Sequence, residues 1–422
     1  MMGCRHCGSP VETVFVDLGS SPPSNAYLTA DRLSGPEVWY PLRVLVCESC
    51  WLVQTEDFTA AAELFDAEYA YFSGFSSGWL EHCDRYAEAM VNRFDLDEES
   101  RVVEVASNDG TLLQHFGDRG VQCLGIEPTA GTASAARRLG LEVIEEFLTG
   151  ELADRLVGDG LRADLLVANN VVAHVPDIDD FVAACRCVLA PAGVATFEFA
   201  HLVRLVEEAQ FDTIYHEHFS YLSLTAFQSI ATGAGLEIFD VEELPTHGGS
   251  LRVFVQVAAT GIQAVSPTVS EMLVSEAATG VTSSPFYAGF QERADDIKDG
   301  LVRFLLDARR DGHSVMGYGA AAKGNTLLNY AGIRPDLLRS VVDRNPAKQG
   351  RFLPGSRVPI VEEAELTAIR PDHVLILPWN LRDEVVDQLS YVREWGATFV
   401  TAVPELAVWC SSWAAGSRCR MT

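Results

Sequence analysis

The sequence predicts an α/β protein with a small metal-binding module at its N-terminus and two further domains, each built around a largely parallel β-sheet. Three observations predict this fold. Two C-x2-C pairs lie within the first 50 residues, buried strands alternate with helix-length segments from residue 101, and this alternation resumes after a helix-rich stretch that begins near residue 285. We place the domains at residues 1–68, 69–284 and 285–422.

The composition limits the classes of function. The chain has 422 residues, 48% of them hydrophobic, and a net charge of −28, so it is long enough for two or three domains with buried cores. The negative charge argues against a nucleic acid partner. The N-terminus has no cationic segment leading into an apolar one, and no window approaches the roughly 18 apolar residues of a membrane span. We expect a cytoplasmic, monomeric enzyme with no membrane partner.

The N-terminal module contains the pairs Cys4 and Cys7, and Cys47 and Cys50. Together they supply four thiolates, the ligand set of a structural zinc site. Four protein ligands leave no open position for a substrate, so we expect Zn²⁺ to stabilise the module. The alternative is a redox dithiol, which would not require the second pair. His6 lies inside the first pair and could replace a cysteine, but four sulfur atoms make it unnecessary.

The second domain begins with a recognisable strand and helix rhythm. "RVVEVASNDGTLLQHF" (101–116) reads as a buried strand, a tight turn of small residues and a helix. "VQCLGIEPTA" (121–130) is a strand that ends in an acid, and "ADLLVANNVVAHV" (163–175) is a strand that ends in asparagines. Strands separated by helix-length segments predict a doubly wound parallel sheet, which binds ligands at the carboxyl ends of its strands.

Polar residues at these strand ends indicate a cofactor that contains a nucleoside. The turn at 106–110 lets a ligand approach the backbone closely, and Glu127 is placed to accept hydrogen bonds from a ribose diol. A full G-x-G-x-x-G for pyrophosphate is lacking, which disfavours NAD and favours S-adenosylmethionine (SAM). His174, just beyond the third strand, is expected beside the same site in an architectural role. The expected SAM-binding residues are Glu104, Ser107, Asn108, Gly110, Glu127, Asn169 and His174.

The segment "TIYHEHFSY" (213–221) concentrates histidines, a carboxylate and phenols. It could be a metal site, a catalytic base with its partners, or a polar patch. His216 and His218 lack the H-E-x-x-H spacing of a metal site, and SAM chemistry needs a base and not a Lewis acid. Nearby, Glu198 ends the strand "ATFEF", where it could reach substrate or this segment. His247 precedes two glycines and is either a substrate ligand or a packed loop residue.

The third domain repeats the nucleotide-fold pattern. "HSVMGYGAAAKGNTLLNYAG" (313–332) reads as strand, glycine turn and helix, "LRSVVDRNP" as a strand ending in an acid, and "PDHVLILPWN" as another strand. Gly317 and Gly319, followed by Gly324, could suggest a dinucleotide site, but the spacing is not G-x-G-x-x-G. The pattern therefore predicts a second Rossmann-like domain and leaves an NAD-dependent oxidoreductase as the alternative function.

Four segments closely resemble the SAM-dependent sugar C-methyltransferases of antibiotic deoxysugar biosynthesis. They are "YHEHFSY" (215–221), "THGGSLRV" (246–253), "GYGAAAKGNTLLNYAGI" (317–333) and "VVDRNPAKQGRFLPG" (341–355), and the resemblance covers essentially the whole chain. It implies a zinc-binding N-terminal module, a class I SAM methyltransferase domain and a C-terminal Rossmann-like domain that binds a nucleotide sugar. One departure is Ala322, where the family has proline, and it affects loop stiffness more than chemistry.

The resemblance also implies a reaction. The family's substrate is a dTDP-4-keto-6-deoxyhexose, in which the carbon beside the ketone carries an acidic proton. The family motif makes His218 the base, as suits a side chain with an unperturbed pKa of about 6.5, and it leaves the role of His216 undefined. Methylation is expected at C3, with a C5-methylating relative as the alternative. Tyr215 and Glu217 would line the sugar pocket with Tyr69 or Tyr71, and Lys323, Asn325 and Lys348 would face the diphosphate.

Overall fold

The computed structural model describes residues 2–58, 64 and 77–409. The chain forms two compact units. The first comprises Met1–Thr13, Leu45–Val203 and His218–Tyr287, and the second comprises Val14–Val44, Arg204–Glu217 and Ala288–Thr422. We expected three domains, at residues 1–68, 69–284 and 285–422, and these ranges are distributed over the two units. The three-domain division stays a prediction.

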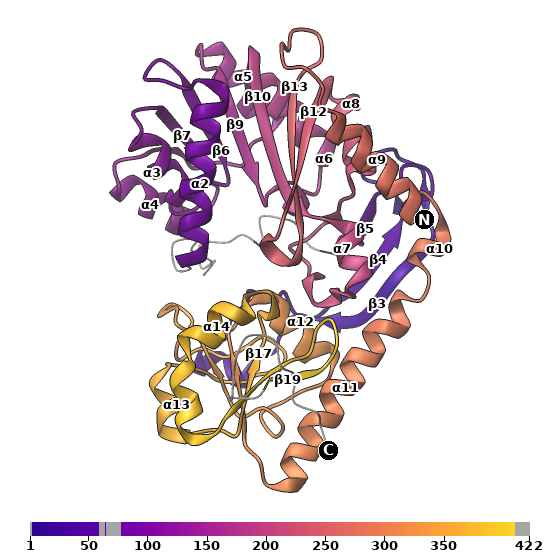
Figure 1. Ribbon diagram of the computed structural model, residues 1–422, viewed down its shortest axis with the longest axis vertical. Helices are drawn as coiled ribbons and strands as arrows, with labels where there is room; N and C mark the ends of the chain where they lie inside the picture. Colours follow the sequence, from indigo (N-terminus) through magenta and orange to yellow (C-terminus); the bar gives the residue numbers. More distant parts are fainter. Residues whose placement is uncertain (1, 59–63, 65–76, 410–422) are drawn as a thin grey trace. The chain divides into compact units, whose positions relative to one another are not determined.

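The first unit is built on a seven-stranded sheet with the order β12-β13-β10-β9-β6-β7-β8 (Figure 1). The five strands from β10 to β8 in this order pair in parallel, whereas β13 pairs antiparallel with both β10 and β12. The predicted doubly wound sheet is therefore confirmed, with an antiparallel edge in addition. The strands are β6 (Arg101–Val105), β7 (Gln122–Ile126), β8 (Glu142–Ile144), β9 (Ala163–Asn169), β10 (Leu189–Ala200), β12 (Leu236–Leu244) and β13 (Ser250–Val257).

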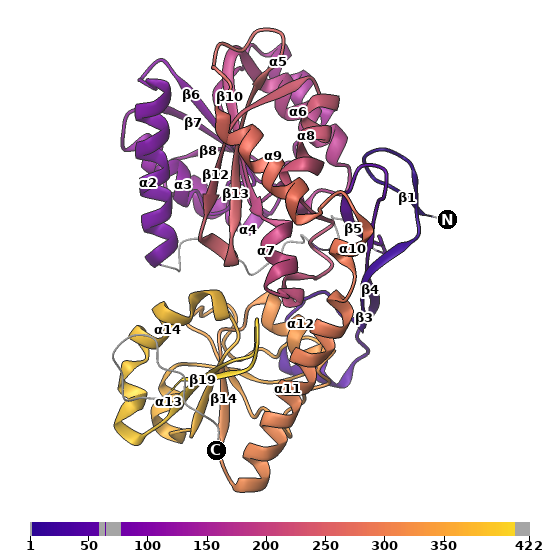
Figure 2. The same cartoon turned by 45° about the vertical axis from the view of Figure 1, so that its right-hand side comes forward.

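Helices cover both faces of this sheet (Figure 2). Leu166 of β9 packs in a core with residues of α5, α6 and α8, while the next residue, Val167, packs in a second core with α2 and α3. This alternation follows from the period of two in a strand, and it explains why the central strands are apolar throughout. The helices are α2 (Ser77–Phe94), α3 (Thr111–Gly117), α4 (Ala130–Arg138), α5 (Gly150–Gly158), α6 (Ile178–Val188), α8 (Leu224–Gly233) and α9 (Pro267–Thr279).

Side-chain caps fix where several of these helices begin. The Thr149 hydroxyl accepts a hydrogen bond from the Leu152 N–H at the start of α5, and the Asp177 carboxylate does the same for Asp180 in α6. Ser223 caps α8, and Ser266 caps α9, whose first residue is a proline. Oxygen caps satisfy donors that have no partner within the helix, and proline at the first position loses no hydrogen bond.

The N-terminal segment adds two small pairings to the first unit. Strands β1 (Met2–Gly3) and β2 (Pro10–Val11) pair antiparallel. Strand β5 (Val53–Thr55), just after the second cysteine pair, pairs antiparallel with β11 (Ser220–Tyr221) from the "TIYHEHFSY" segment. A strand next to the cysteines is thus bonded directly to the segment that carries His218.

The second unit contains a six-stranded sheet with the order β16-β15-β14-β17-β18-β19, and all of its pairs are parallel except the last. This arrangement confirms the predicted second Rossmann-like pattern. The strands are β14 (Val315–Tyr318), β15 (Val341–Val342), β16 (Ile360–Val361), β17 (His373–Ile376), β18 (Thr398–Thr401) and β19 (Ala407–Trp409), and the helices are α11 (Phe290–Asp311), α12 (Ala322–Tyr330), α13 (Ala364–Ile369) and α14 (Arg382–Gln388).

Other elements lie at the junctions between the two units in the sequence. Strands β3 (Thr13–Ser21) and β4 (Tyr40–Val46) and helix α7 (Leu202–Glu207) run through the points where the chain passes from one unit to the other, and α10 (Ser284–Tyr287) ends the first unit. Within the parts of the chain that the structure describes, no helix combines the length and the apolar character needed to cross a membrane.

Candidate active site and metal centre

The four predicted zinc ligands gather at one point in the first unit. The sulfur atoms of Cys4, Cys7, Cys47 and Cys50 all lie within 4.8 Å of one another. Cys4 and Cys50 are 3.5 Å apart, as are Cys7 and Cys47. The hydrogen bond from Cys50 lowers the pKa of the Cys4 thiol to about 5, so one thiolate forms readily. Four converging sulfurs, one of them acidic, fit a tetrahedral Zn²⁺ site.

His6 is bonded to side chains outside the cysteine cluster. Its Nδ1 lies 2.7 Å from a carboxylate oxygen of Asp179, and its Nε2 lies 3.0 Å from the Ser229 hydroxyl. These partners belong to α6 and α8. His6 therefore docks the first cysteine knuckle onto the helices of the sheet, and the zinc site keeps its four sulfurs.

The predicted SAM-binding turn joins β6 to α3. Ala106 and Asn108 adopt positive φ angles of 53° and 50°, and Gly110, at φ 81°, precedes the helix. A Cβ on Gly110 would collide with the side chain of Leu141. The backbone conformation therefore favours glycine at this position, and a larger residue would also have to displace the Leu141 side chain.

Glu127, directly after β7, holds this turn in place. One of its carboxylate oxygens accepts a hydrogen bond from the Asn108 N–H at 2.9 Å. The other accepts from the Thr129 N–H at 2.9 Å and from the Thr129 hydroxyl. The acid expected to receive a ribose diol is therefore already oriented by neighbouring donors, and the oxygen that accepts from Asn108 keeps a lone pair for a ligand.

Buried polar atoms at the same strand ends fit a polar cofactor. Within the described residues, four such atoms have no hydrogen-bond partner: Glu104 Oε2, Ser107 Oγ, Asn169 Oδ1 and Asn170 Nδ2. Burial, together with the charges of Asp109 and Glu127, raises the pKa of Glu104 well above its usual value. Buried polar atoms are normally paired. A SAM molecule, with its ribose hydroxyls and amino acid group, offers partners for this set.

The sequence reading missed two residues of this region. Gly125 of β7 makes room for Ser107, because a Cβ at this position would overlap the Ser107 hydroxyl. Asn170, at φ 57°, turns the chain away from β9. The available signals were a glycine inside the predicted strand at 121–130 and a second asparagine at the end of the predicted strand at 163–175.

His174 and His218 lie together in the first unit. His174 ends the short helix η3 (Val172–His174), which follows β9, and its ring centroid lies 4.6 Å from that of His218. The Phe219 N–H donates to the Ala173 carbonyl at 2.7 Å. The predicted base is therefore held against the segment that follows β9. His174 contacts His218, and it also lies next to the predicted SAM site.

The three residues before His218 belong to the second unit. The buried carboxylate of Glu217 accepts hydrogen bonds from the backbone and side-chain N–H groups of Asn25, both at 3.2 Å, and burial raises its pKa. His216 is also buried, with Nε2 3.1 Å from the Pro41 carbonyl, and burial lowers its pKa. A neutral ring that donates to a carbonyl gives His216 an architectural role. Tyr215 belongs to the same segment of the second unit, and Tyr69 and Tyr71 lie outside the described residues.

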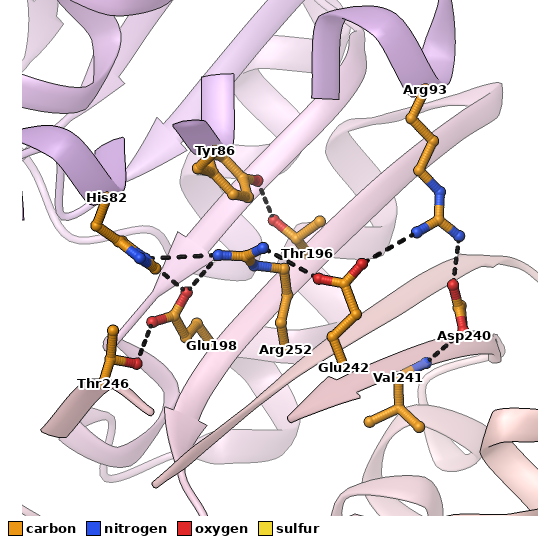
Figure 3. Close-up of polar contacts among 10 residues, drawn as sticks. All are labelled: His82, Tyr86, Arg93, Thr196, Glu198, Asp240, Val241, Glu242, Thr246 and Arg252. Carbon is orange, nitrogen blue, oxygen red and sulfur yellow. Dashed lines mark hydrogen bonds and ion pairs between the residues drawn. The ribbon is translucent and has the colours of Figure 1, made fainter. Parts of the chain in front are cut away.

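Glu198 of β10 lies at the centre of a buried polar network in the first unit (Figure 3). One carboxylate oxygen is 3.1 Å from Arg252 Nη2 and 3.3 Å from His82 Nε2, and the other accepts from the Thr246 hydroxyl at 3.1 Å. Burial by itself would raise the pKa of Glu198, but the hydrogen bond from His82 and the charge of Arg252 lower it. The carboxylate is thus ionised and engaged by neighbouring side chains.

The network extends from Glu198 along the sheet. Arg252 pairs with Glu242 at 3.1 Å and lies over the ring of Tyr86, and Arg93 pairs with Asp240 at 2.6 Å. Sequence reasoning missed these arginines and His82, because their partners are far away along the chain and no spacing marks them.

His247 occupies the turn between β12 and β13. Its φ of 57° is unusual for a residue other than glycine, and its ring centroid lies 5.8 Å from that of Trp79 in α2. Trp79 in turn stacks on His82 at 5.0 Å. Thr246, the residue before His247, is the one that donates to Glu198. The network therefore holds this turn from two sides.

The three candidates for diphosphate binding lie in the second unit. Lys323 Nζ donates to the Asn380 side chain at 2.8 Å and lies over the Trp379 ring, and burial lowers its pKa. Lys348 Nζ donates to the Ala320 carbonyl, in the glycine turn that precedes Lys323, at 2.8 Å. Asn325 is buried and contacts the Ser24 carbonyl through its Nδ2 at 3.4 Å. The lysines thus gather near the carboxyl ends of β14 and β15.

Family models cover most of the chain. Residues 4–65 match the model described as "Putative zinc binding domain", residues 79–241 match "Methyltransferase domain" and residues 245–404 match "C-methyltransferase C-terminal domain". With the sheet order and the strand-end residues, these matches define a class I SAM-dependent methyltransferase that carries a zinc-binding module. The chain is 33% identical over 402 residues to C-methyltransferase NovU of Streptomyces niveus, which covers 95% of each protein. It therefore belongs to the C-methyltransferase family.

More distant similarities cover smaller parts of the chain. A ubiquinone biosynthesis O-methyltransferase of Rhodopseudomonas palustris is 26% identical over 159 residues, which cover 32% of this chain and 61% of that protein. The magnesium protoporphyrin IX methyltransferase of Synechocystis PCC 6803, solved with bound SAM, matches 42% of this chain and 79% of its own with 13% identity and a TM-score of 0.34. The predicted methyl transfer and the predicted SAM and zinc are confirmed by the family assignment.

Proposed function

We propose that this C-methyltransferase acts on a dTDP-4-keto-(di)deoxyhexose, at C3, in antibiotic deoxysugar biosynthesis. The observation that carries the proposal is the contact between His218 and His174, 4.6 Å between ring centroids, directly after strand β9. This contact supports a position of the His218 imidazole next to the strand ends whose residues fit SAM. Methylation of carbon requires a base near the methyl donor, and histidine is basic enough to act at neutral pH.

The reaction begins with the acidic proton on the carbon beside the ketone. His218 takes this proton, and the electrons of the C–H bond form the enolate. Bound SAM supplies an electrophilic methyl group. The enolate carbon would take this methyl group as the sulfur–methyl bond breaks, with the bonding electron pair left on the sulfur of S-adenosylhomocysteine. His218 then returns its proton to solvent.

The other site residues bind and orient the sugar. Tyr215 donates a hydrogen bond to the developing enolate oxygen, which stabilises the transition state more than the ketone. Glu217, whose pKa is raised by burial, orients a sugar hydroxyl. Tyr69 or Tyr71 and His247 contribute to the sugar pocket. Lys323, Asn325 and Lys348 bind the diphosphate, since charged donors suit its oxygens.

Glu198 has a changed role in this proposal. Its two oxygens are engaged by Arg252, His82 and Thr246. We therefore assign it to holding the turn that carries His247, and not to direct contact with the substrate.

The proposal is tested by incubating the purified protein with SAM and a panel of dTDP-4-keto-deoxyhexoses with and without a C2 hydroxyl or a C3 amino group. We expect a mass increase of one methyl group in at least one sugar, and a methyl carbon bonded to C3 in its NMR spectrum. Methylation at C5 would correct the position. An absence of methyl transfer across the panel would contradict the substrate class.

Two further predictions rest on the composition alone. We propose that the enzyme is cytoplasmic and monomeric, because a net charge of −28 makes copies of the chain repel one another. Light scattering coupled to gel filtration should give a mass near 46.0 kDa. A mass twice as large would contradict the monomer.

A further inference from the structure

We propose that Arg5, inside the first zinc knuckle, is a positioning residue for the catalytic segment that carries His218. The inference rests on the proposed function, because it takes His218 as the base. It gives the zinc module a part in the reaction beyond the stability of its own fold. Arg5 and the residues it contacts, Thr55, Pro176 and Phe219, all belong to the first unit.

Arg5 is a buried side chain with partners on both sides of this segment. Only 5% of the side chain is exposed. Its Nη2 donates to the Thr55 carbonyl at 3.0 Å, and its Nη1 donates to the Pro176 carbonyl at 2.9 Å. Its guanidinium carbon lies 5.5 Å from the centroid of the Phe219 ring. One planar cation thus joins the end of β5, the chain after η3 and the residue that follows His218.

The segments that Arg5 joins are those that hold the backbone of His218 and Phe219. On one side, the Thr55 N–H donates to the Phe219 carbonyl at 3.1 Å, and the Thr55 hydroxyl donates to the His218 carbonyl at 3.3 Å. On the other side, the Phe219 N–H donates to the Ala173 carbonyl at 2.7 Å. Arg5 therefore bridges the two supports of the predicted base.

The cysteine cluster fixes Arg5 relative to β5. Cys4 and Cys7 flank Arg5 in sequence, and Cys50 lies three positions before the first residue of β5. The N–H of Cys47 donates to the Leu52 carbonyl at 2.9 Å, which closes the second knuckle just before the strand. The residues fit a zinc ion that would tie both knuckles together. Metal binding would then hold Arg5 and Thr55 at a fixed separation.

The geometry requires arginine. Its guanidinium donates in several directions within one plane and lies flat against an aromatic ring, whereas a lysine ammonium is a point charge on a flexible stem. Hydrogen bonds from a charged donor to buried carbonyls are worth more than neutral ones, and their loss leaves those carbonyls unpaired. An Arg5→Lys change keeps the charge and loses the bridge.

The test compares Arg5→Ala and Arg5→Lys with His6→Ala. His6 is a matched control, because it lies in the same knuckle and docks on Asp179 and Ser229, away from the catalytic segment. Zinc content, SAM affinity, steady-state methyl transfer and amide hydrogen exchange are measured for each variant. Hydrogen exchange does not depend on a substrate, and it reports directly on the amides of Thr55 and Phe219.

We expect both Arg5 variants to retain one zinc ion and to bind SAM within about twofold of the wild type. Their amides in 53–55 and 218–221 should exchange at least about tenfold faster, and kcat should fall roughly 10- to 100-fold, since small misplacements of reacting groups cost this much. Arg5→Lys should fall between Arg5→Ala and the wild type. His6→Ala should keep the exchange rates of these amides and kcat near wild-type values.

Equal exchange and kcat in the Arg5 and His6 variants would overturn the inference, as would wild-type values in Arg5→Lys. If Arg5→Ala does not fold, Thr55→Val, which removes the hydroxyl bonded to the His218 carbonyl, takes its place with the same expected directions. Failure of the proposed function is distinguished easily. In that case the wild type transfers no methyl group to the sugars, while the hydrogen exchange comparison still decides the role of Arg5.

Discussion

Buried glutamates at the carboxyl edge of the first sheet show how neighbours decide the behaviour of a residue. Glu104 has a buried oxygen with no partner among the residues described, and its pKa rises. Glu198, with an arginine and a histidine beside it, is ionised even though its side chain is fully buried. The sequence marks both equally, as acids at strand ends. Only the spatial partners separate an acid that keeps a buried oxygen unpaired from an acid that is bonded to the residues around a turn.

Glu104 predicts a pH-dependent effect on stability. Below the usual carboxyl pKa, the folded and unfolded states both hold the proton, so Glu104 and a glutamine at this position differ little. As the pH rises, the unfolded chain releases the proton while the folded state retains it, so Glu104 lowers stability until the raised pKa is reached. Without SAM, Glu104→Gln should therefore be more stable than the wild type near pH 7 and similar to it near pH 4.

This prediction is checked by denaturant unfolding of both proteins across that pH range. SAM affinity is measured for the same two proteins, and we expect Glu104→Gln to bind SAM more weakly because the variant loses a hydrogen-bond acceptor. A variant that is less stable than the wild type at pH 7 in the absence of SAM would show that Glu104 is ionised and stabilising.

At the scale of elements, the turn between β12 and β13 depends on the network around Glu198. Glu198→Gln removes the charge that pairs with buried Arg252, and breaking a buried ion pair costs about 3 to 5 kcal/mol. Glu242→Gln is the matched control, because it removes the second carboxylate that pairs with Arg252. The Glu242 side chain is 41% exposed. The control should cost about 1 kcal/mol or less. Urea unfolding measures both, and equal losses would contradict the central place of Glu198.

The zinc module gives a second prediction at this scale. A double variant, Cys4→Ser with Cys7→Ser, should lose its zinc, because two ligands are removed and metal binding is coupled to folding of the site. Metal analysis and a thermal melt check this, with Cys83→Ser as the control, since Cys83 is buried outside the cluster. Stoichiometric zinc in the double variant would contradict the four-cysteine site.

The elements could be predicted from the sequence where the signal is local. The parallel strands, the glycine turns and the cysteine pairs follow from period, turn residues and spacing. The antiparallel pairing of β13 with β10, the docking of His6 and the ion pairs of Arg252 could not be predicted, because each depends on residues that meet only after folding. For the same reason, the bonds that Glu198 makes to Arg252, His82 and Thr246 could not be predicted.

For the whole molecule, the notable feature is the place where the two compact units divide the chain. The boundary falls between Glu217 and His218, inside the motif that carries the family resemblance. Each unit builds its own part of this motif: Asn25 bonds Glu217 in the second unit, and His174 contacts His218 in the first. Sequence reading placed all the motif residues in one domain, because a contiguous motif gives no sign of such a division.

The central claim is that His218 removes the proton beside the ketone. The most direct measurement is exchange of that proton with deuterated solvent, followed by NMR in the presence of the enzyme, the 4-keto sugar and S-adenosylhomocysteine, which permits proton removal without methyl transfer. The wild type should exchange the proton. His218→Asn, with SAM affinity and melting temperature near those of the wild type, should lose exchange and methyl transfer together, by a factor of about 100 or more. Exchange at the wild-type rate in this variant would show that another group is the base.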